Sequence, residues 1–409
     1  TWAVTKAEDV LTDDKKQIQE IDVTTAHEEF VEGKTELSLE NFNVGTEKVD
    51  SKVVDVTIGV GLGSNQAITE NKSKTTLKFK PGTYKGENLS IEAYNADYSK
   101  NTADGNGGSY VEISPLAAKA KHTNESETTV NISGEINTSG DVSVVGANYV
   151  QSEMYADAIR AKIVGGSGVT VDNIINNTAT VNLQDAKIKA DGSVSVGTYN
   201  TAVFNKENDK AVLGNGYGAG DTTCGYVNND ITTTANTNLL GSTSIISNGE
   251  QNYYADTDTD IKSAIYVLSG ALIPNSSSIN TLKMTSNNTV KLANAAKLAT
   301  SDDASDITFA ANDQHKLVIT SLSESIGAVN FATVAKNYNT VNRNNTIKVE
   351  GNISSLHDVN LFAGKGINGE LGLMDLYSTA EAYSKSAIPV SGAQPHIYNE
   401  FNQTNTVNV

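Results

Sequence analysis

The sequence predicts an all-β fold of the parallel β-helix class, a β-solenoid, and two observations carry that prediction. The first is a repeat, because the pattern of residues 129–144 returns without gaps at residues 346–361. The second is alternation, since every second residue in these runs is apolar, so that one face would be buried and the other wet. Short strands that stack on equivalent strands of the next repeat satisfy both observations.

The repeats cover most of the chain. Aligning the first Thr of each unit places repeat starts near Thr24, Thr76, Thr129, Thr180, Thr237, Thr289, Thr346 and Thr406, which are 51 to 60 residues apart. Residues 1–409 are therefore interpreted as one β-solenoid array of about seven repeats, taken from a longer chain. Because a solenoid coil commonly needs roughly twenty-odd residues, each repeat is expected to form two coils, and about fourteen coils would span on the order of 70 Å.

Within each repeat the pattern predicts several short strands. The second strand of the repeat is expected at residues 88–91, 141–144, 193–196, 306–309 and 358–361. A third is expected at residues 169–171, 226–227 and near Val334, followed by polar corners at 176–177, 233–234, 287–288 and 344–345. Corner Asn residues in register would form ladders of amide hydrogen bonds, or Asn is there because it tolerates left-handed turns. Both readings stay open.

Length variation between repeats falls in residues 148–168, 200–225 and 364–386, which are expected to form loops on one side of the solenoid. These segments and their neighbours are rich in tyrosine, which would either contact a partner or cover the apolar edge of the rod. The tyrosines concerned are Tyr149, Tyr155, Tyr199, Tyr217, Tyr253, Tyr254, Tyr377 and Tyr383.

Composition and charge exclude several classes of function. The formal net charge is −18, and Arg160 and Arg343 are the two arginines, so the chain lacks the basic stripe that nucleic-acid binding needs. Cys224 is the single cysteine, which excludes an intrachain disulfide and a cysteine-based metal site. No apolar run approaches the roughly 18 residues of a membrane helix, so membrane insertion is not expected.

Three motifs bear on ligand binding. Asp256, Asp258 and Asp260 lie at period two, so in a strand they would share one face and offer oxygen ligands to a hard cation; a solvated loop is the alternative. Residues 214–221 hold one glycine- and aspartate-rich copy of the kind that binds calcium only in tandem. Glycines of residues 59–63 do not match a dinucleotide-binding fingerprint and would instead let coils pass closely.

Catalytic chemistry has little support in the sequence. The histidines His27, His122, His315, His357 and His396 fall at different positions of the repeat and are expected on the surface. None of the usual local signatures of a Ser/His/Asp site accompanies them. The sequence therefore indicates no catalytic, cofactor-binding or metal-binding residue, and the chain is not expected to be an enzyme.

The repeat unit resembles that of leukotoxin-type filamentous adhesins, which are filamentous-haemagglutinin-like proteins of anaerobic diderm bacteria. The resemblance is clearest over residues 169–196, and residues 129–144 and 346–363 follow the same pattern. It implies a right-handed parallel β-helix, export by a two-partner or related route, and a place on the cell surface or in the medium. The repeat pattern specifies architecture, so the resemblance transfers no functional residue to this chain.

These observations together predict a structural and binding protein, the rod of a secreted or surface-exposed adhesin. Its expected partners are a protein or glycan of a host or bacterial surface, and a second copy of the chain through end-to-end self-association. An extracellular carbohydrate-active enzyme on the same fold, or a segment of a secreted leukotoxin, are the alternatives.

Overall fold

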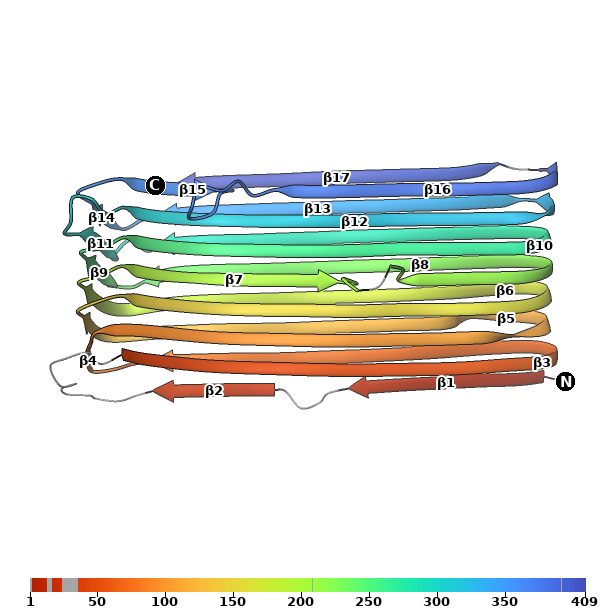
Figure 1. Ribbon diagram of the computed structural model, residues 1–409, viewed down its shortest axis with the longest axis horizontal. Helices are drawn as coiled ribbons and strands as arrows, with labels where there is room; N and C mark the ends of the chain where they lie inside the picture. Colours follow the sequence, from red (N-terminus) through yellow and green to blue (C-terminus); the bar gives the residue numbers. More distant parts are fainter. Residues whose placement is uncertain (1, 13–16, 24–35, 208, 391) are drawn as a thin grey trace.

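The computed structural model describes residues 2–12, 17–23, 36–207, 209–390 and 392–409, and these residues form an all-β structure (Figure 1). Its strands are β1 (Trp2–Thr12), β2 (Gln17–Val23), β3 (Glu36–Phe79), β4 (Thr83–Gly86), β5 (Asn88–Thr138), β6 (Val142–Ala190), β7 (Val194–Phe204), β8 (Val212–Leu240), β9 (Ser244–Ser247), β10 (Gln251–Leu292), β11 (Lys297–Thr300), β12 (Ile307–Asn330), β13 (Ala332–Val349), β14 (Asn352–Ser354), β15 (Val359–Ala363), β16 (Met374–Pro389) and β17 (Ala393–Asn408). Among the described residues no helix is long and apolar enough to cross a membrane.

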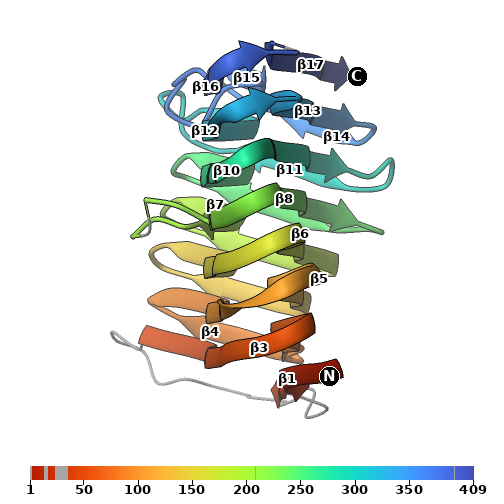
Figure 2. The same cartoon turned by 90° about the vertical axis from the view of Figure 1, so that its right-hand side faces the viewer.

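The chain runs back and forth in stacked layers, which we call rungs (Figures 1 and 2). In each rung the chain extends to one end of the molecule, turns, and returns along the opposite face. All strand pairings between rungs are parallel, and each residue pairs with the residue one repeat later, as Leu89 does with Val142 and Val142 with Val194. This arrangement of long parallel strands is consistent with a β-solenoid.

The register corrects the expectation that each repeat forms two coils. Thr76 pairs with Thr129, and Thr129 pairs with Thr180, so one repeat supplies one rung. The stack is consequently about half as long along its axis as predicted, and each rung is correspondingly wider. The reason is that polar inward residues do not end the strands, so the chain continues straight where a corner was expected.

Most of the aligned threonines mark equivalent positions in successive rungs. Thr289 pairs with Thr346 and Thr346 with Thr406, as the repeat pattern requires. Thr237 is displaced by one position, because Asn236 is the residue that pairs with Thr180 and Thr289. The predicted repeat start at Thr24 lies outside the described residues.

The second strands of the repeat are confirmed, whereas the third strands are not separate elements. Residues 88–91, 141–144, 193–196, 306–309 and 358–361 sit at the beginnings of rungs, with Ile307 paired to Val359. Residues 169–171, 226–227 and Val334 are interior parts of β6, β8 and β13. The predicted loop of residues 148–168 is instead strand, because it lies within β6 and alternates between the two faces over most of its length. The predicted loops 200–225 and 364–386 are also largely strand, since β7, β8 and β16 cover residues 200–204, 212–225 and 374–386, and residues 364–373 do form a loop.

Inward and outward residues alternate along nearly every rung, which encloses a core between the two faces. One large apolar cluster lies where the rungs begin and end, and includes Leu89, Val142, Val194, Tyr253 and Phe309. A second lies farther along the rungs and includes Met154, Val171 and Ile265. Polar side chains fill the remaining inward positions, and they hold the candidate sites described next.

Candidate functional site

Amide ladders connect the last rungs of the stack. Asn345 lies between Asn288 and Asn405, accepting a hydrogen bond from the Asn288 amide at 3.0 Å and donating one to Asn405 at 3.1 Å. On the outer face Asn344 donates to Asn287 at 2.9 Å. The predicted ladders are therefore confirmed here, but within long strands and not at corners.

The ladders do not extend to the other predicted Asn and Thr pairs. Asn177 pairs in register with Thr233, which itself pairs with Ser286, so these residues belong to a different column. The Asn177 amide instead donates across the interior to the carbonyl of Thr201, at 3.3 Å. Left-handed backbone is not the reason for Asn at these positions, since the described non-glycine residues with positive φ are Asp185 and Asn205.

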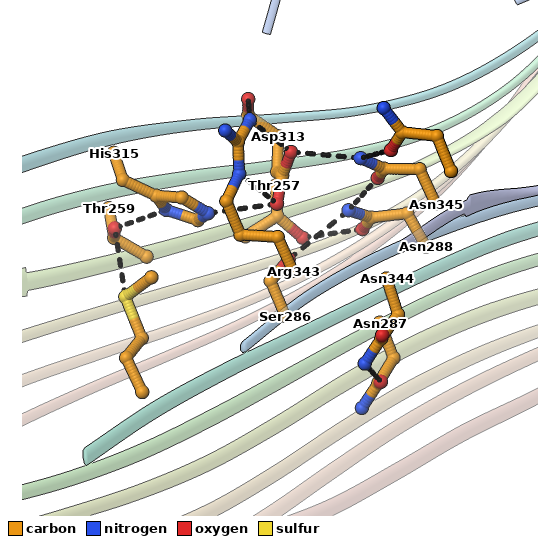
Figure 3. A network of polar contacts seen from close by, with 12 residues as sticks. Thr257, Thr259, Ser286, Asn287, Asn288, Asp313, His315, Arg343, Asn344 and Asn345 are labelled. Atoms are coloured by element: carbon orange, nitrogen blue, oxygen red, sulfur yellow. Dashed lines mark hydrogen bonds and ion pairs between the residues drawn. The ribbon is translucent and has the colours of Figure 1, made fainter. Parts of the chain in front are cut away.

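A charged cluster is enclosed beside the inner ladder, where β10, β12 and β13 meet (Figure 3). The Arg343 guanidinium donates to both carboxylate oxygens of Asp313, at 2.6 and 3.1 Å. His315 Nε2 lies 2.9 Å from the same carboxylate, and its Nδ1 lies 2.7 Å from the Thr259 hydroxyl. Burial opposes ionisation of Asp313, but the hydrogen bonds from His315 and Arg343 outweigh it, so the pKa of Asp313 is lowered.

This cluster has the residue types of a catalytic site, but it is built as part of the core. Asp313 is completely buried, His315 is 3% exposed and Arg343 is 5% exposed. Asn345 donates a further hydrogen bond to Asp313 at 3.0 Å, so the carboxylate is fully engaged by protein groups. The arrangement therefore stabilises the interior charge of this rung.

A second buried histidine lies in an earlier rung. His122 is 1% exposed, and its Nδ1 lies 2.8 Å from the Thr69 hydroxyl. Burial lowers the pKa of His122 to about 4, an effect that nearby Asp97 only partly opposes. The expectation that histidines lie on the surface is thus wrong for His122 and His315. Both occupy inward positions of the alternating pattern, so the sequence already held a signal for their burial. The expectation is confirmed for His357 and His396, while His27 lies outside the described residues.

The glycine motifs serve packing around buried ion pairs. Lys162 Nζ lies 2.7 Å from the Asp221 carboxylate, and both side chains are fully buried. Asp221 of the predicted calcium-like segment is therefore engaged by lysine. Gly63 faces the buried Arg160 guanidinium so closely that a Cβ there would lie 2.4 Å from a guanidinium nitrogen. Burial lowers the pKa of Arg160, although Glu112, 3.6 Å away, favours its charged form.

Exposed apolar side chains line the end of the stack where the rungs turn back, and we call this the apolar edge. Its members are Val56, Ile58, Tyr110, Val111, Ile113, Ile163, Val164, Tyr217, Leu272, Ile273, Phe331, Ile388 and Val390. Val111 pairs with both Val60 and Val164, so the side chains form columns across successive rungs. Val56 is 82% exposed and Ile58 78%, which is unusual for such large aliphatic side chains in a folded protein.

The opposite edge of the stack carries an exposed group that combines Asp306, His357 and Asp358. Asp306 accepts a hydrogen bond from the backbone N–H of Asp358 at 3.2 Å, and it also contacts His357 Nδ1. The hydrogen bond and charge of Asp306 raise the pKa of His357. Asn88 and Asp141 accept equivalent backbone hydrogen bonds from the following rung, at 2.8 Å each, so Asp306 plays a structural role that recurs along the stack.

An acidic cavity of about 160 Å³ lies on the outer face under the loop of residues 364–373. Asp256 and Asp258 line it from β10, Asn312 and Gln314 from β12, and Glu370 from the loop. The three aspartates of the predicted motif do share one face, because Thr257 and Thr259 between them point inward. They belong to a strand and not to a solvated loop.

The tyrosines divide between covering and exposed positions. Tyr253 is buried in the core, where its ring lies 5.1 Å from that of Phe309. Tyr149, Tyr155 and Tyr254 are partly buried along the outer face, as expected for residues that cover the rod. Tyr199, Tyr217, Tyr377 and Tyr383 are exposed and available for contact.

No protein-family model, curated protein or solved structure matches this chain. The resemblance to filamentous adhesins therefore stays a prediction from the repeat pattern alone.

Proposed function

We propose that this chain is a structural and binding scaffold, a right-handed parallel β-solenoid that forms the rod of a secreted or surface-exposed bacterial adhesin. The apolar edge is the observation that carries the proposal. An array of exposed aliphatic and aromatic side chains that continues from rung to rung is typical of a surface that binds another macromolecule. Because successive rungs contribute to it, the edge offers a long, straight contact surface.

The charge distribution favours this edge over the rest of the surface as the binding region. Outward positions on the two faces carry many lysine and acid pairs between neighbouring rungs, such as Lys74 with Glu127 at 3.1 Å and Lys119 with Asp172 at 2.7 Å. Such paired, hydrated faces contribute solubility, and desolvating them on binding would be unfavourable. The proposed partner is therefore a protein surface of a host or bacterial cell, or the apolar edge of a second copy.

The enzyme alternative has less to support it. The constellation closest to a catalytic site, around Asp313 and His315, is buried and its hydrogen-bonding groups are engaged by neighbouring rungs. A glycan chain needs an open groove lined by reachable carboxylates, which this cluster does not offer.

The test replaces Ile58, Ile163 and Leu272 of the apolar edge together by Ser in the full chain. Beads coated with the purified protein would be scored for attachment to epithelial and bacterial cells, and sedimentation would report self-association. The triple variant should lose at least about tenfold in attachment or association, while a variant with Lys72, Lys74 and Lys283 changed to Ser should retain both. Equal behaviour of the two variants in both assays would disprove the proposal, provided that circular dichroism shows both to be folded.

A further inference from the structure

Among the residues that the structure describes, no lysine or arginine lines the acidic cavity to balance its carboxylates. Asp256, Asp258 and Glu370 line it together with uncharged side chains and loop backbone. Elsewhere on the outer faces, acids commonly pair with a lysine one rung away, as in Lys72–Glu125, Lys74–Glu127, Lys119–Asp172, Lys283–Asp230 and Lys385–Glu324. At the cavity the neighbouring rungs instead offer Asn312 beside Asp256 and Gln314 beside Asp258.

A second observation is independent of the negative charge. Asn312 has the outward parity of its strand, yet it is only 6% exposed because the loop of residues 364–373 covers it. Its amide oxygen is buried and has no hydrogen-bond partner among the described residues, and the same holds for Oδ1 of Asp256. A buried polar oxygen without a partner is unfavourable by about 1 to 3 kcal/mol. The Asn312 amide lies between the two sides of the loop, with its nitrogen towards Gly366, which lines the cavity, and its oxygen towards Gly372. A half-turn of the amide directs the oxygen to the cavity, where a cation would supply the partner that both buried oxygens lack.

The covering loop is an insertion peculiar to the last rung. Residue 311 of β12 pairs with residue 363, and the next pair along β12 joins His315 to Met374. The loop of residues 364–373 therefore lies opposite only three residues of β12, 312–314. The loop closes on itself through hydrogen bonds from Gly366 to the carbonyl of Glu370, at 2.8 Å, and from Gly369 to the carbonyl of Gly366, at 2.9 Å. This closure brings the Glu370 side chain to the cavity.

We propose that this cavity is a binding site for a hard divalent cation of the calcium type, held by the carboxylates of Asp256, Asp258 and Glu370 and the amide oxygen of Asn312. All of these ligands are oxygens, as Ca²⁺ requires. Residues on adjacent rungs are about 4.8 Å apart, which lets Asp256 and Asn312 reach one ion at the usual Ca–O distances of about 2.3 to 2.6 Å. Ca²⁺ is favoured over Mg²⁺ because strand and loop ligands form an irregular shell and not an octahedron.

The bound ion would tie the insertion loop of the last rung to β10, two rungs earlier. A cation in the cavity would favour the ionised carboxylate and remove the repulsion among the acids. Calcium would therefore order the loop and stabilise the end of the stack.

Calorimetry and Tb³⁺ luminescence on the full chain, freed of metal with EGTA, test the site. Tyr199 lines the cavity, so Tb³⁺ bound there should show tyrosine-sensitised emission that Ca²⁺ displaces. The double variant Asp256→Asn, Asp258→Asn should bind Ca²⁺ at least tenfold more weakly than the unchanged chain. Asp260→Asn is the matched control, because Asp260 lies on the same strand and face but outside the cavity, and its affinity should be unchanged.

Glu370→Gln provides a second variant, since Glu370 is exposed on the loop and its replacement does not disturb the strands. It should weaken Ca²⁺ binding several-fold while circular dichroism stays the same. Absence of saturable Ca²⁺ binding to the unchanged chain at millimolar concentration would overturn the proposal. So would equal affinity of the double variant and the Asp260→Asn control, or Mg²⁺ binding as tight as that of Ca²⁺.

Discussion

Two kinds of inward-facing column share the interior of this stack, and they tolerate variation differently. In one, Ile91, Val144, Val196, Tyr253, Phe309 and Leu361 follow each other in register through six rungs. In the other, Thr128, Ala179, Ala235, Asn288, Asn345 and Asn405 follow each other in the same way. The apolar column changes side-chain size freely, from Val to Tyr and Phe, whereas the polar column forms hydrogen bonds only where neighbours are complementary.

The difference follows from the two forces involved. Apolar burial has no preferred direction, so any apolar side chain of about the right size contributes to stability. A buried polar group is favourable only with a partner at hydrogen-bonding distance, which must come from the same rung or the next one. Apolar columns thus contribute most of the stability. Polar columns make the stacking specific, because their hydrogen bonds form only when particular rungs are neighbours.

The largest expected effect is a charge placed in an apolar column. Val142→Asp should destabilise the protein by on the order of 5 kcal/mol, because Val142 is 1% exposed and lies in an apolar cluster, where the new carboxylate would be buried among hydrophobic side chains. Ser143→Asp, on the outward parity, should change the free energy of unfolding by less than about 0.5 kcal/mol. Urea unfolding measures both, and equal losses would contradict the inward and outward assignment.

The next effect concerns the charged polar column around Asp313. Arg343→Met removes the guanidinium and leaves the Asp313 carboxylate buried without its main partner, which should cost about 3 to 4 kcal/mol. Lys348→Met is the control and should be close to neutral, because Lys348 lies on the outward parity of the same β13 and its partly exposed ammonium pairs with Glu350. A loss below about 1 kcal/mol in urea unfolding for Arg343→Met would mean that the pair contributes no net stability to this column.

A pH titration isolates the contribution of buried His122, which pairs in register with Thr69 and Asn173 in a polar column. The pKa of buried His122 is lowered to about 4, so the unfolded chain takes up a proton at this residue below about pH 6.5 and the folded chain does not. The contribution of neutral His122 to the free energy of unfolding is fully present above pH 6.5. It falls by about 3 kcal/mol as the pH is lowered towards 4. His122→Gln should remove that part of the acid sensitivity, and exposed His396→Gln should not. Parallel pH profiles for all three proteins would refute this account.

The smallest effect compares the inner and outer amide ladders. Asn288→Ala should cost about 1 to 2 kcal/mol, because it leaves the buried hydroxyl of Thr257 without its acceptor and the amide oxygen of Asn345 without its donor. Asn287→Ala breaks only the partly exposed hydrogen bond with Asn344 and should cost a few tenths. If thermal unfolding gives the same shift for both, burial is not what distinguishes the two ladders.

Several features could be predicted from the sequence because they depend on neighbours along the chain. Alternation of apolar residues at 141–144 and 193–196 correctly indicates strand and inward parity, since side chains of a strand alternate between its faces. The parity of Asp256, Asp258 and Asp260 was predictable for the same reason. The repeat also identifies which residues stack, as the pairing of Thr76, Thr129 and Thr180 confirms.

The tertiary structure alone decided how far each strand runs and which polar groups meet. Each repeat forms one rung and not two, because inward Ser, Thr and Asn residues do not end a strand. Their polar groups find hydrogen-bond partners on the opposite face of the same rung or on the next rung. The contact of Asp313 with Arg343, and the covering of Asn312 by the loop of residues 364–373, join segments separated by 30 residues or more. The local sequence pattern does not indicate which side chains meet across such separations, because the packing of one rung on the next sets the distances between them.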